Sequence, residues 1–157
     1  MGDEHGGTYG FGVGNDGAQG YDGVEWGFGA GAGEVSLDTS KAASFTVSFP
    51  SRAQEANGQT SPEELIAAAH SSCYSMQLSG LLGANGTPPE RIETSAVVSF
   101  GKKGDGFAIL GIVLTARASV PGLAAEQFAE IAETAKRICP VSAALTGTEI
   151  TLDAALA

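Results

Sequence analysis

Long apolar runs, basic residues and cysteines are all scarce in this chain of 157 residues. No apolar run approaches the roughly 18 to 20 residues that a membrane-spanning helix needs. The N-terminus also lacks the basic start and the apolar stretch of a secretory signal peptide. We therefore predict a cytoplasmic location and no membrane partner.

Basic side chains are outnumbered by acidic ones, with 8 Lys and Arg against 18 Asp and Glu and a formal net charge of -10. Residues 1–40 contain no Lys or Arg at all. Contacts from basic side chains to phosphate supply most of the affinity of proteins for nucleic acid. We therefore expect no nucleic-acid partner, and the negative charge bears on solubility and not on activity.

Cysteine is limited to Cys73 and Cys139. Two cysteines in a cytosolic chain are too few for a structural disulfide framework, so a bridge between them would be transient and catalytic. His70 precedes Cys73 by three residues, but no second Cys-x-x-Cys or His-x-x-x-His pattern supplies the other ligands of a zinc site. The glycines do not stand between an apolar strand and a helix start, as a nucleotide-binding motif requires. We predict neither a metal nor an organic cofactor.

Glycine dominates the N-terminal part of the chain. Residues 1–8 have no apolar periodicity and are predicted to form a flexible tail, ahead of a single domain over residues 9–157. From Tyr9 to Gly33 large apolar residues alternate with glycine, which suits a strand with one sparse face.

A helix start is the strongest local signal in the middle of the chain. Ser61 is a suitable N-cap, Pro62 suits the first turn and Glu64 completes a capping box, so a long helix is predicted from here to the glycines at 83–86. Apolar and small residues occupy most of its turns, which predicts burial on several sides. Two features precede it: a hairpin of alternating residues, 35–37 and 45–49, and a polar surface loop at 50–61.

The rest of the chain predicts a second hairpin, a second amphipathic helix and a final strand. The order of strands and helices is that of an α+β protein and not of a wound parallel sheet. The predicted elements are strands 92–100 and 107–120 with a loop at 101–106, a helix at 124–138, a short turn at 141–145 and a strand at 149–156.

Local reasoning leaves the roles of the two cysteines open. Cys73 lies in the middle of the long helix, where a packed thiol and a nucleophile are both consistent with its small neighbours. Cys139 stands between the second helix and Pro140, so backbone N–H groups of a new helix could stabilise its thiolate, or it could simply pack at the junction. By this reasoning Cys139 is the more acidic thiol. His70 shares a helical face with Cys73, and a packed or hydrogen-bonded histidine is favoured over a general base.

Two segments resemble the OsmC branch of the OsmC/Ohr family. They are Thr60-Ser-Pro-Glu-Glu-Leu-Ile-Ala-Ala-Ala-His-Ser-Ser-Cys-Tyr-Ser-Met76 and Ile138-Cys-Pro-Val-Ser-Ala-Ala-Leu145. The similarity continues at 87–94, 106–109, 118–122 and 149–153, and so covers about residues 26 to 157. Trp26-Gly and Gly33-Glu-Val35 resemble the first strand of the family.

The resemblance implies an activity and a set of site residues. Members of the family reduce organic hydroperoxides and hydrogen peroxide as tightly intertwined homodimers, with sites at the subunit interface. Their fold packs two long central helices with antiparallel sheets. By motif, Cys73 corresponds to the peroxidatic cysteine and Cys139 to the resolving one, Arg52 to the arginine that stabilises the thiolate, and Glu63 to the glutamate that orients that arginine.

The implied reaction runs through a Cys73 thiolate, a sulfenic acid and a Cys73–Cys139 disulfide that an external dithiol reduces. A lipoyl-type dithiol is one candidate reductant. Two alternatives remain on the same fold: a thiol redox sensor, and a non-enzymatic protein that binds an apolar ligand.

Helix geometry adds a constraint on Glu63. It precedes Cys73 by ten residues on one helix, which separates them by about 15 Å along the axis and roughly 80° around it. If Glu63 orients an arginine beside Cys73, we predict that it comes from the partner chain of a dimer.

Overall fold

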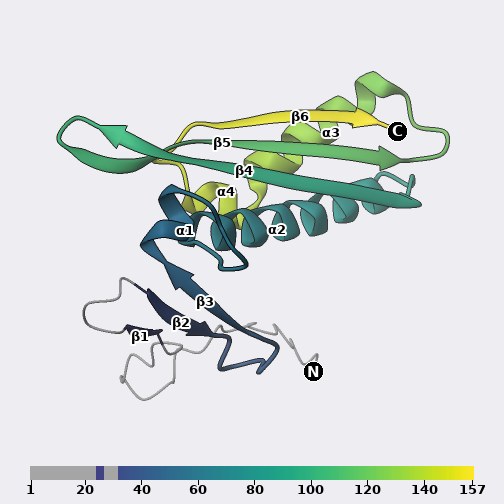
Figure 1. Ribbon diagram of the computed structural model, residues 1–157. Coiled ribbons are helices and arrows are strands. Elements are labelled where there is room, and N and C mark those ends of the chain that lie inside the picture. Colours follow the sequence, from purple (N-terminus) through teal and green to yellow (C-terminus); the bar gives the residue numbers. More distant parts are fainter. Residues whose placement is uncertain (1–23, 27–31) are drawn as a thin grey trace, which may run out of the picture. The chain divides into compact units, whose positions relative to one another are not determined.

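The structure is a computed structural model in which residues 24–26 and 32–157 are described. They belong to two compact units, one ending at Ser61 and the other beginning at Pro62 (Figure 1). The predicted tail at 1–8 and the glycine-spaced segment that begins at Tyr9 lie outside the described residues. The single domain over 9–157 stays a prediction.

The described part of the N-terminal unit contains a three-stranded antiparallel sheet. Its strands lie in the order β1, β2, β3 and are Val24–Trp26, Ala32–Ser36 and Ser44–Ser48. The predicted hairpin is confirmed, since Val35 of β2 pairs with Phe45 of β3. Trp26 and Gly33 lie on neighbouring strands, directly opposite each other, and not on one strand.

The predicted loop at 50–61 is wrong at its start, where Phe49–Ala53 form the short helix α1. Ser48 is its N-cap: the Ser48 Oγ accepts from the Ser51 amide at 3.1 Å, and the Ser51 Oγ accepts from the Ser48 amide at 3.1 Å. Pro50 suits the first turn because its missing N–H would have no helical partner there. Reciprocal capping, the pattern that predicts a helix start at Ser61, is therefore observed at Ser48.

The C-terminal unit contains three strands and three helices in the predicted α+β order. α2 begins at Pro62, as its start signal predicts. The elements are α2 (Pro62–Ala84), β4 (Arg91–Lys103), β5 (Gly106–Ser119), α3 (Ala125–Ile138), α4 (Pro140–Ala144) and β6 (Ile150–Leu156).

The β4–β5 hairpin is longer than predicted. Lys103 pairs with Gly106, so the expected loop at 101–106 shrinks to Gly104 and Asp105. Gly104 has φ 62°, a left-handed conformation that glycine adopts without a steric penalty and that a tight hairpin turn requires. The rings of Phe100 and Phe107 stack at 5.4 Å between centroids, which supports pairing close to the turn.

The sheet of the C-terminal unit is mixed, in the order β4-β5-β6. β4 and β5 are antiparallel, whereas β6 runs parallel to β5, with Leu114 opposite Leu152. The antiparallel pairing that the resemblance implies therefore holds for β4 and β5 but not for β6. The reason is the connection: α3 and α4 return the chain to the other end of the sheet, as a parallel crossover requires.

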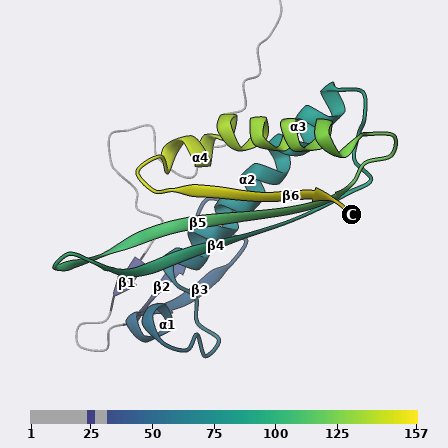
Figure 2. The same ribbon diagram turned by 90° about the horizontal axis from the view of Figure 1, so that it is seen from above.

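α2 and α3 pack on one face of this sheet (Figure 2). The buried residues of α2 recur about every fourth position, as the period of 3.6 residues per helical turn requires. Those of β5 alternate, because successive side chains of a strand point to opposite faces. Burying each large apolar side chain contributes about 1.5 to 3 kcal/mol. The core includes Tyr74, Leu78 and Leu82 of α2, Leu114, Ala116 and Ala118 of β5, and Phe128, Ala132 and Ala135 of α3.

The opposite side of α2 is exposed within the single chain. Met76 is 73% exposed, so the prediction that α2 is buried on several sides is wrong for one chain alone. Among the described residues, no helix is both long enough and apolar enough to cross a membrane.

Candidate active site

Cys73 lies in the middle of α2, beside the buried face of the helix. Its neighbour Tyr74 is fully buried, and the Tyr74 hydroxyl donates to the Ala132 carbonyl of α3 at 3.2 Å. Burial raises the pKa of the Tyr74 phenol far above its usual value, so the hydroxyl stays protonated. Cys73 itself is only partly buried and is a free thiol. The helix thus holds this thiol at the border between core and surface.

Cys139 is the single residue between α3 and α4 and is fully buried. Its amide donates to the Ala135 carbonyl of α3 at 2.9 Å, and its carbonyl accepts from the Ala143 amide of α4 at 2.9 Å. Pro140 begins α4, because proline fits the first turn of a helix and cannot continue the preceding one. Backbone hydrogen bonds therefore connect this cysteine to the end of α3 and to the first turn of α4.

The fold brings the two thiols into contact although they are 66 residues apart. The Sγ atoms of Cys73 and Cys139 are 3.3 Å apart, and both cysteines are free. A disulfide has an S–S distance of about 2.05 Å, so a small approach would join them. This pair is the structural centre of the candidate site.

The described surroundings of Cys73 disfavour its thiolate. Burial raises the pKa of the Cys73 thiol above its ordinary value, a backbone hydrogen bond from Val141 opposes this, and the adjacent Cys139 raises the pKa further. The Val141 N–H belongs to the first turn of α4. The amide expected beside Cys139 thus serves Cys73 instead, and Cys139 caps α4 without a side-chain hydrogen bond. The hydrogen bond expected at Cys139 is therefore made at Cys73.

His70 is a buried, hydrogen-bonded histidine, as predicted. Its Nε2 lies 2.8 Å from the Ser142 Oγ of α4. Its Nδ1 is also buried, and it has no hydrogen-bond partner within residues 24–26 and 32–157. Burial lowers the pKa of His70 below its ordinary value, which keeps the ring neutral.

Glu63 and Arg52 are held by different elements. Glu63 is the second residue of α2 and is 7% exposed. Because α2 is one continuous helix, Glu63 is separated from Cys73 by the expected distance of about 15 Å. Arg52 lies in the last turn of α1 in the N-terminal unit and is partly buried.

A metal centre finds no support in the part of the chain that the structure describes. No group of three or more His, Cys, Asp or Glu side chains there is arranged to hold an ion.

Residues 55–154 match the family described as OsmC-like protein. Peroxiredoxin OsmC of Escherichia coli (strain K12) is 45% identical to this chain over 123 residues, which cover 78% of this chain and 85% of that protein. The chain belongs to the OsmC-like protein family.

Solved structures agree with this membership. The organic hydroperoxide resistance protein OhrB of Bacillus subtilis superimposes with a TM-score of 0.67 at 26% identity, covering 86% of this chain and 95% of that one. An organic hydroperoxide resistance protein from Elizabethkingia anophelis has a TM-score of 0.70 at 24% identity, covering 86% and 94%. The fold of this chain is thus the α+β fold of OsmC-like and organic hydroperoxide resistance proteins.

Within this OsmC-like chain, Glu63, Cys73 and Cys139 fall inside the matched residues, and Arg52 lies just before them. Two neighbours of the thiols, Val141 and Ser142, were not identified from the sequence. A signal for Ser142 exists, because it is the only residue of the segment Pro140–Ala144 with a polar side chain. Its partner becomes evident only in the folded chain.

Proposed function

We propose that this chain is a thiol-dependent peroxidase that reduces organic hydroperoxides or hydrogen peroxide. The observation that carries the proposal is the 3.3 Å contact between the Sγ atoms of Cys73 and Cys139. The relatives named peroxiredoxin and organic hydroperoxide resistance protein support it. A partly exposed thiol beside a fully buried one suits a pair in which only the first meets the substrate.

The reaction uses Cys73 as the nucleophile and Cys139 as the resolving thiol. The Cys73 thiolate attacks one oxygen of the peroxide bond, which breaks, and after proton uptake an alcohol or water leaves while Cys73 becomes a sulfenic acid. The Cys139 thiol then displaces the sulfenic hydroxyl as water and forms the Cys73–Cys139 disulfide. An external dithiol, of the lipoyl type as one candidate, returns both thiols and is itself oxidised to a disulfide. Sulfur carries the whole redox change, so the cycle needs no cofactor.

Arg52 is proposed to stabilise the Cys73 thiolate. The pKa of Cys73 is raised by its described surroundings, so a positive charge must oppose that effect for the thiol to react near neutral pH. An opposite charge within about 4–6 Å lowers a pKa by roughly 1 to 3 units. Arg52 is the residue that the family motif assigns to this task.

The active unit is proposed to be a homodimer in which Glu63 of the partner subunit orients Arg52. The long separation of Glu63 from Cys73 on α2 supports this arrangement. The exposed side of α2 supports a subunit contact, because it has no charged residue beyond the first turn and includes a methionine. That side comprises Ala68, Ala69, Ser72, Met76, Ser79, Gly80 and Gly83. A cytoplasmic location, where dithiol reductants are available, fits the reaction.

Peroxide consumption with an added dithiol tests the two cysteine roles. Cys73→Ser is expected to lose turnover, and Cys139→Ser to react once and then stall or become overoxidised. Ser119→Ala is the control, since the Ser119 Oγ of β5 donates to the Glu90 carboxylate at 3.0 Å, outside the thiol pair and the exposed side of α2, and its loss should leave turnover intact. Sustained turnover by Cys73→Ser would overturn the proposal, and a wild type that forms the disulfide without sustained turnover would favour the redox sensor.

The pH dependence of thiol alkylation tests Arg52. Replacement of Arg52 by Gln should raise the pKa of Cys73 and slow its attack on peroxide about 10- to 1,000-fold at pH 7. Lys41→Gln, which removes an exposed charge from the same unit, should leave both unchanged. An unaltered Cys73 pKa in Arg52→Gln would remove this residue from the site.

Mixed dimers test the source of Glu63. Cys73→Ser and Glu63→Gln chains with different tags are co-expressed, and the heterodimer is isolated. If Glu63 acts across the interface, the heterodimer has one site with Cys73 and Glu63 both intact and regains activity that each homodimer lacks. A heterodimer as inactive as the two homodimers would place Glu63 in the same subunit as its site.

A further inference from the structure

Two side-chain contacts join the same two segments of the C-terminal unit. Cys73 of α2 meets Cys139, the N-cap of α4, with their Sγ atoms 3.3 Å apart. His70 of α2 meets Ser142 of α4, with Nε2 and Oγ 2.8 Å apart. On each segment the two contacting residues are three positions apart, so each pair lies on one face about one turn apart. The thiol contact and the hydrogen bond therefore lie next to each other between the same two segments.

α4 depends on contacts outside itself for its position. It has only five residues, and isolated helices shorter than about 12 to 15 residues are marginal in water. Its sequence is Pro-Val-Ser-Ala-Ala, so Ser142 is the only α4 side chain able to form a hydrogen bond. Ser142 is 5% exposed, and that hydrogen bond is therefore made inside the protein.

His70 depends equally on Ser142. The imidazole is fully buried, and within the described ranges its Nδ1 has no hydrogen-bond partner. Loss of the Ser142 hydroxyl would leave both ring nitrogens without one, which is costly for a buried polar group. The His70–Ser142 pair thus has a strong preference for one arrangement of α4 against α2.

We infer that His70 and Ser142 are positioning residues that keep Cys139 within reach of the Cys73 sulfenic acid, so that resolution outruns overoxidation. The inference rests on the proposed peroxidase function. It concerns the second chemical step only, because neither residue is a member of the thiol pair.

The second step is a competition at Cys73. In resolution, Cys139 attacks the Cys73 sulfur, the S–O bond breaks, water leaves, and the S–S distance falls from 3.3 Å to about 2.05 Å. In overoxidation, the sulfenic acid attacks a second peroxide, whose O–O bond breaks to leave a sulfinic acid and an alcohol or water. The first path depends on where α4 holds Cys139, whereas the second depends on the peroxide concentration.

Removal of the Ser142 hydroxyl should therefore change the ratio of disulfide to sulfinic acid formed at Cys73. It should not change the rate at which Cys73 attacks the first peroxide. In Ser142→Ala we expect disulfide formation to slow by about 10- to 100-fold, since a misplacement of about 1 Å can cost this much. The rate of sulfenic acid formation should stay within about twofold of wild type. Sulfinic acid at Cys73 should accumulate at lower peroxide concentration.

Single-turnover mixing with peroxide, followed by acid quench and mass spectrometry, measures sulfenic acid, disulfide and sulfinic acid. Ser142→Thr keeps the hydroxyl and should recover part of the wild-type partition. Ser75→Ala is the matched control, because it removes another hydroxyl of α2 whose 2.8 Å hydrogen bond goes to Thr94 of β4 and not to α4. A wild-type partition in Ser142→Ala, or an equal defect in Ser75→Ala, would overturn the inference.

A second measurement needs no peroxidase activity. In a Cys73→Ser background, Cys139 is the only thiol and is fully buried, so a thiol reagent should modify it slowly. Addition of Ser142→Ala, or of His70→Ala if the first variant does not fold, should speed this modification about tenfold, through loss of one buried hydrogen bond. Unchanged modification would overturn the inference, whereas failure of the peroxidase proposal would leave this measurement unaffected.

Discussion

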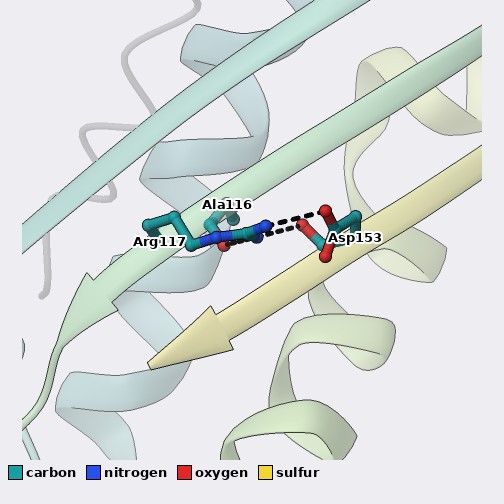
Figure 3. A network of polar contacts seen from close by, with 3 residues as sticks. All are labelled: Ala116, Arg117 and Asp153. Carbon is teal, nitrogen blue, oxygen red and sulfur yellow. Dashed lines mark hydrogen bonds and ion pairs between the residues drawn. The ribbon is translucent and has the colours of Figure 1, made fainter. Parts of the chain in front are cut away.

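Two polar contacts of the C-terminal unit differ mainly in how far they are removed from water. His70 and Ser142 meet between α2 and α4, where both are buried. Arg117 of β5 and Asp153 of β6 meet on the face of the sheet opposite the helices (Figure 3). There the Arg117 guanidinium donates to the Asp153 carboxylate at 2.7 Å and to the Asp153 carbonyl at 3.0 Å.

The exposed contact has more hydrogen bonds and a full charge pair, yet water can replace each of its interactions. The Arg117 hydrogen bond and charge lower the pKa of Asp153 below its ordinary value, and both groups are solvated. Exposed ion pairs contribute little because solvent screens them. His70 and Ser142 are buried, so water cannot readily replace a partner that either of them loses. Burial, and not the number of interactions, should therefore decide which contact matters.

The largest effect on stability is expected for apolar side chains, when a buried one is compared with an exposed one. Leu78→Ala removes a fully buried side chain of α2 and should lower the free energy of unfolding by about 2 to 5 kcal/mol. Val113→Ala, at a residue 44% exposed on the outer face, should lower it by less than about 1 kcal/mol. Urea denaturation followed by circular dichroism measures both. Equal losses of free energy of unfolding in the two variants would show that burial does not distinguish these two positions.

The next effect concerns pH and His70. The pKa of His70 is lower in the folded chain than in the unfolded chain. As the pH falls below about 6.5, the unfolded chain therefore binds a proton at His70 while the folded chain stays unprotonated there. Stability is full above that pH and is lost as the pH falls toward the folded pKa, by at most about 1.4 kcal/mol per pH unit. His70→Gln should remove this part of the slope when denaturation is measured from pH 7 to 5. Identical slopes in the variant and the wild type would contradict the prediction.

A smaller effect is expected at Tyr74. Tyr74→Phe removes the buried hydrogen bond to the Ala132 carbonyl and should cost about 1 kcal/mol. Ser119→Ala removes a hydrogen bond to Glu90 at the surface and should change stability by less than about 0.5 kcal/mol. The two midpoints of urea denaturation give the comparison, and a larger shift for Ser119→Ala would reverse it.

The smallest effect is expected at the exposed ion pair. Asp153→Asn should shift the denaturation midpoint less than Tyr74→Phe does. Added salt should reduce that shift further, because salt screens the attraction between solvent-exposed charges. Because the pKa of Asp153 is lowered in the fold, any stabilisation is present above its unfolded pKa and is lost as the pH falls through the folded one. A shift as large as that of Leu78→Ala would mean that this pair is shielded from water.

Several elements follow from short local signals. Pro62 begins α2 and Pro140 begins α4, because proline favours the first turn of a helix. The β4–β5 hairpin follows from alternation of apolar and polar residues, although its turn is tighter than its glycine and lysine content suggests. α1 was missed although Ser48 and Ser51 carry a capping pattern, since the polar residues after them predict a loop.

The candidate site was predictable only in part. The residues that form it stand in two segments 66 positions apart, and local reasoning gave no reason to bring them together. The family resemblance implied the pairing of Cys73 with Cys139, and the fold places them in contact. Backbone N–H groups at the start of a new helix were expected beside Cys139, but the backbone of Val141 in α4 forms its hydrogen bond with Cys73. Only the packing of α4 against α2 decides which thiol lies before that amide.

The sequence by itself determined the α+β class, the long helix around Cys73 and the absence of a zinc-ligand pattern, because these depend on spacing along the chain. The tertiary structure decided that β6 lies parallel to β5, that Cys73 meets Cys139 and that His70 meets Ser142. These features depend on how distant segments pack. Such packing reflects the burial of α2 and α3 on one sheet, to which residues throughout the unit contribute.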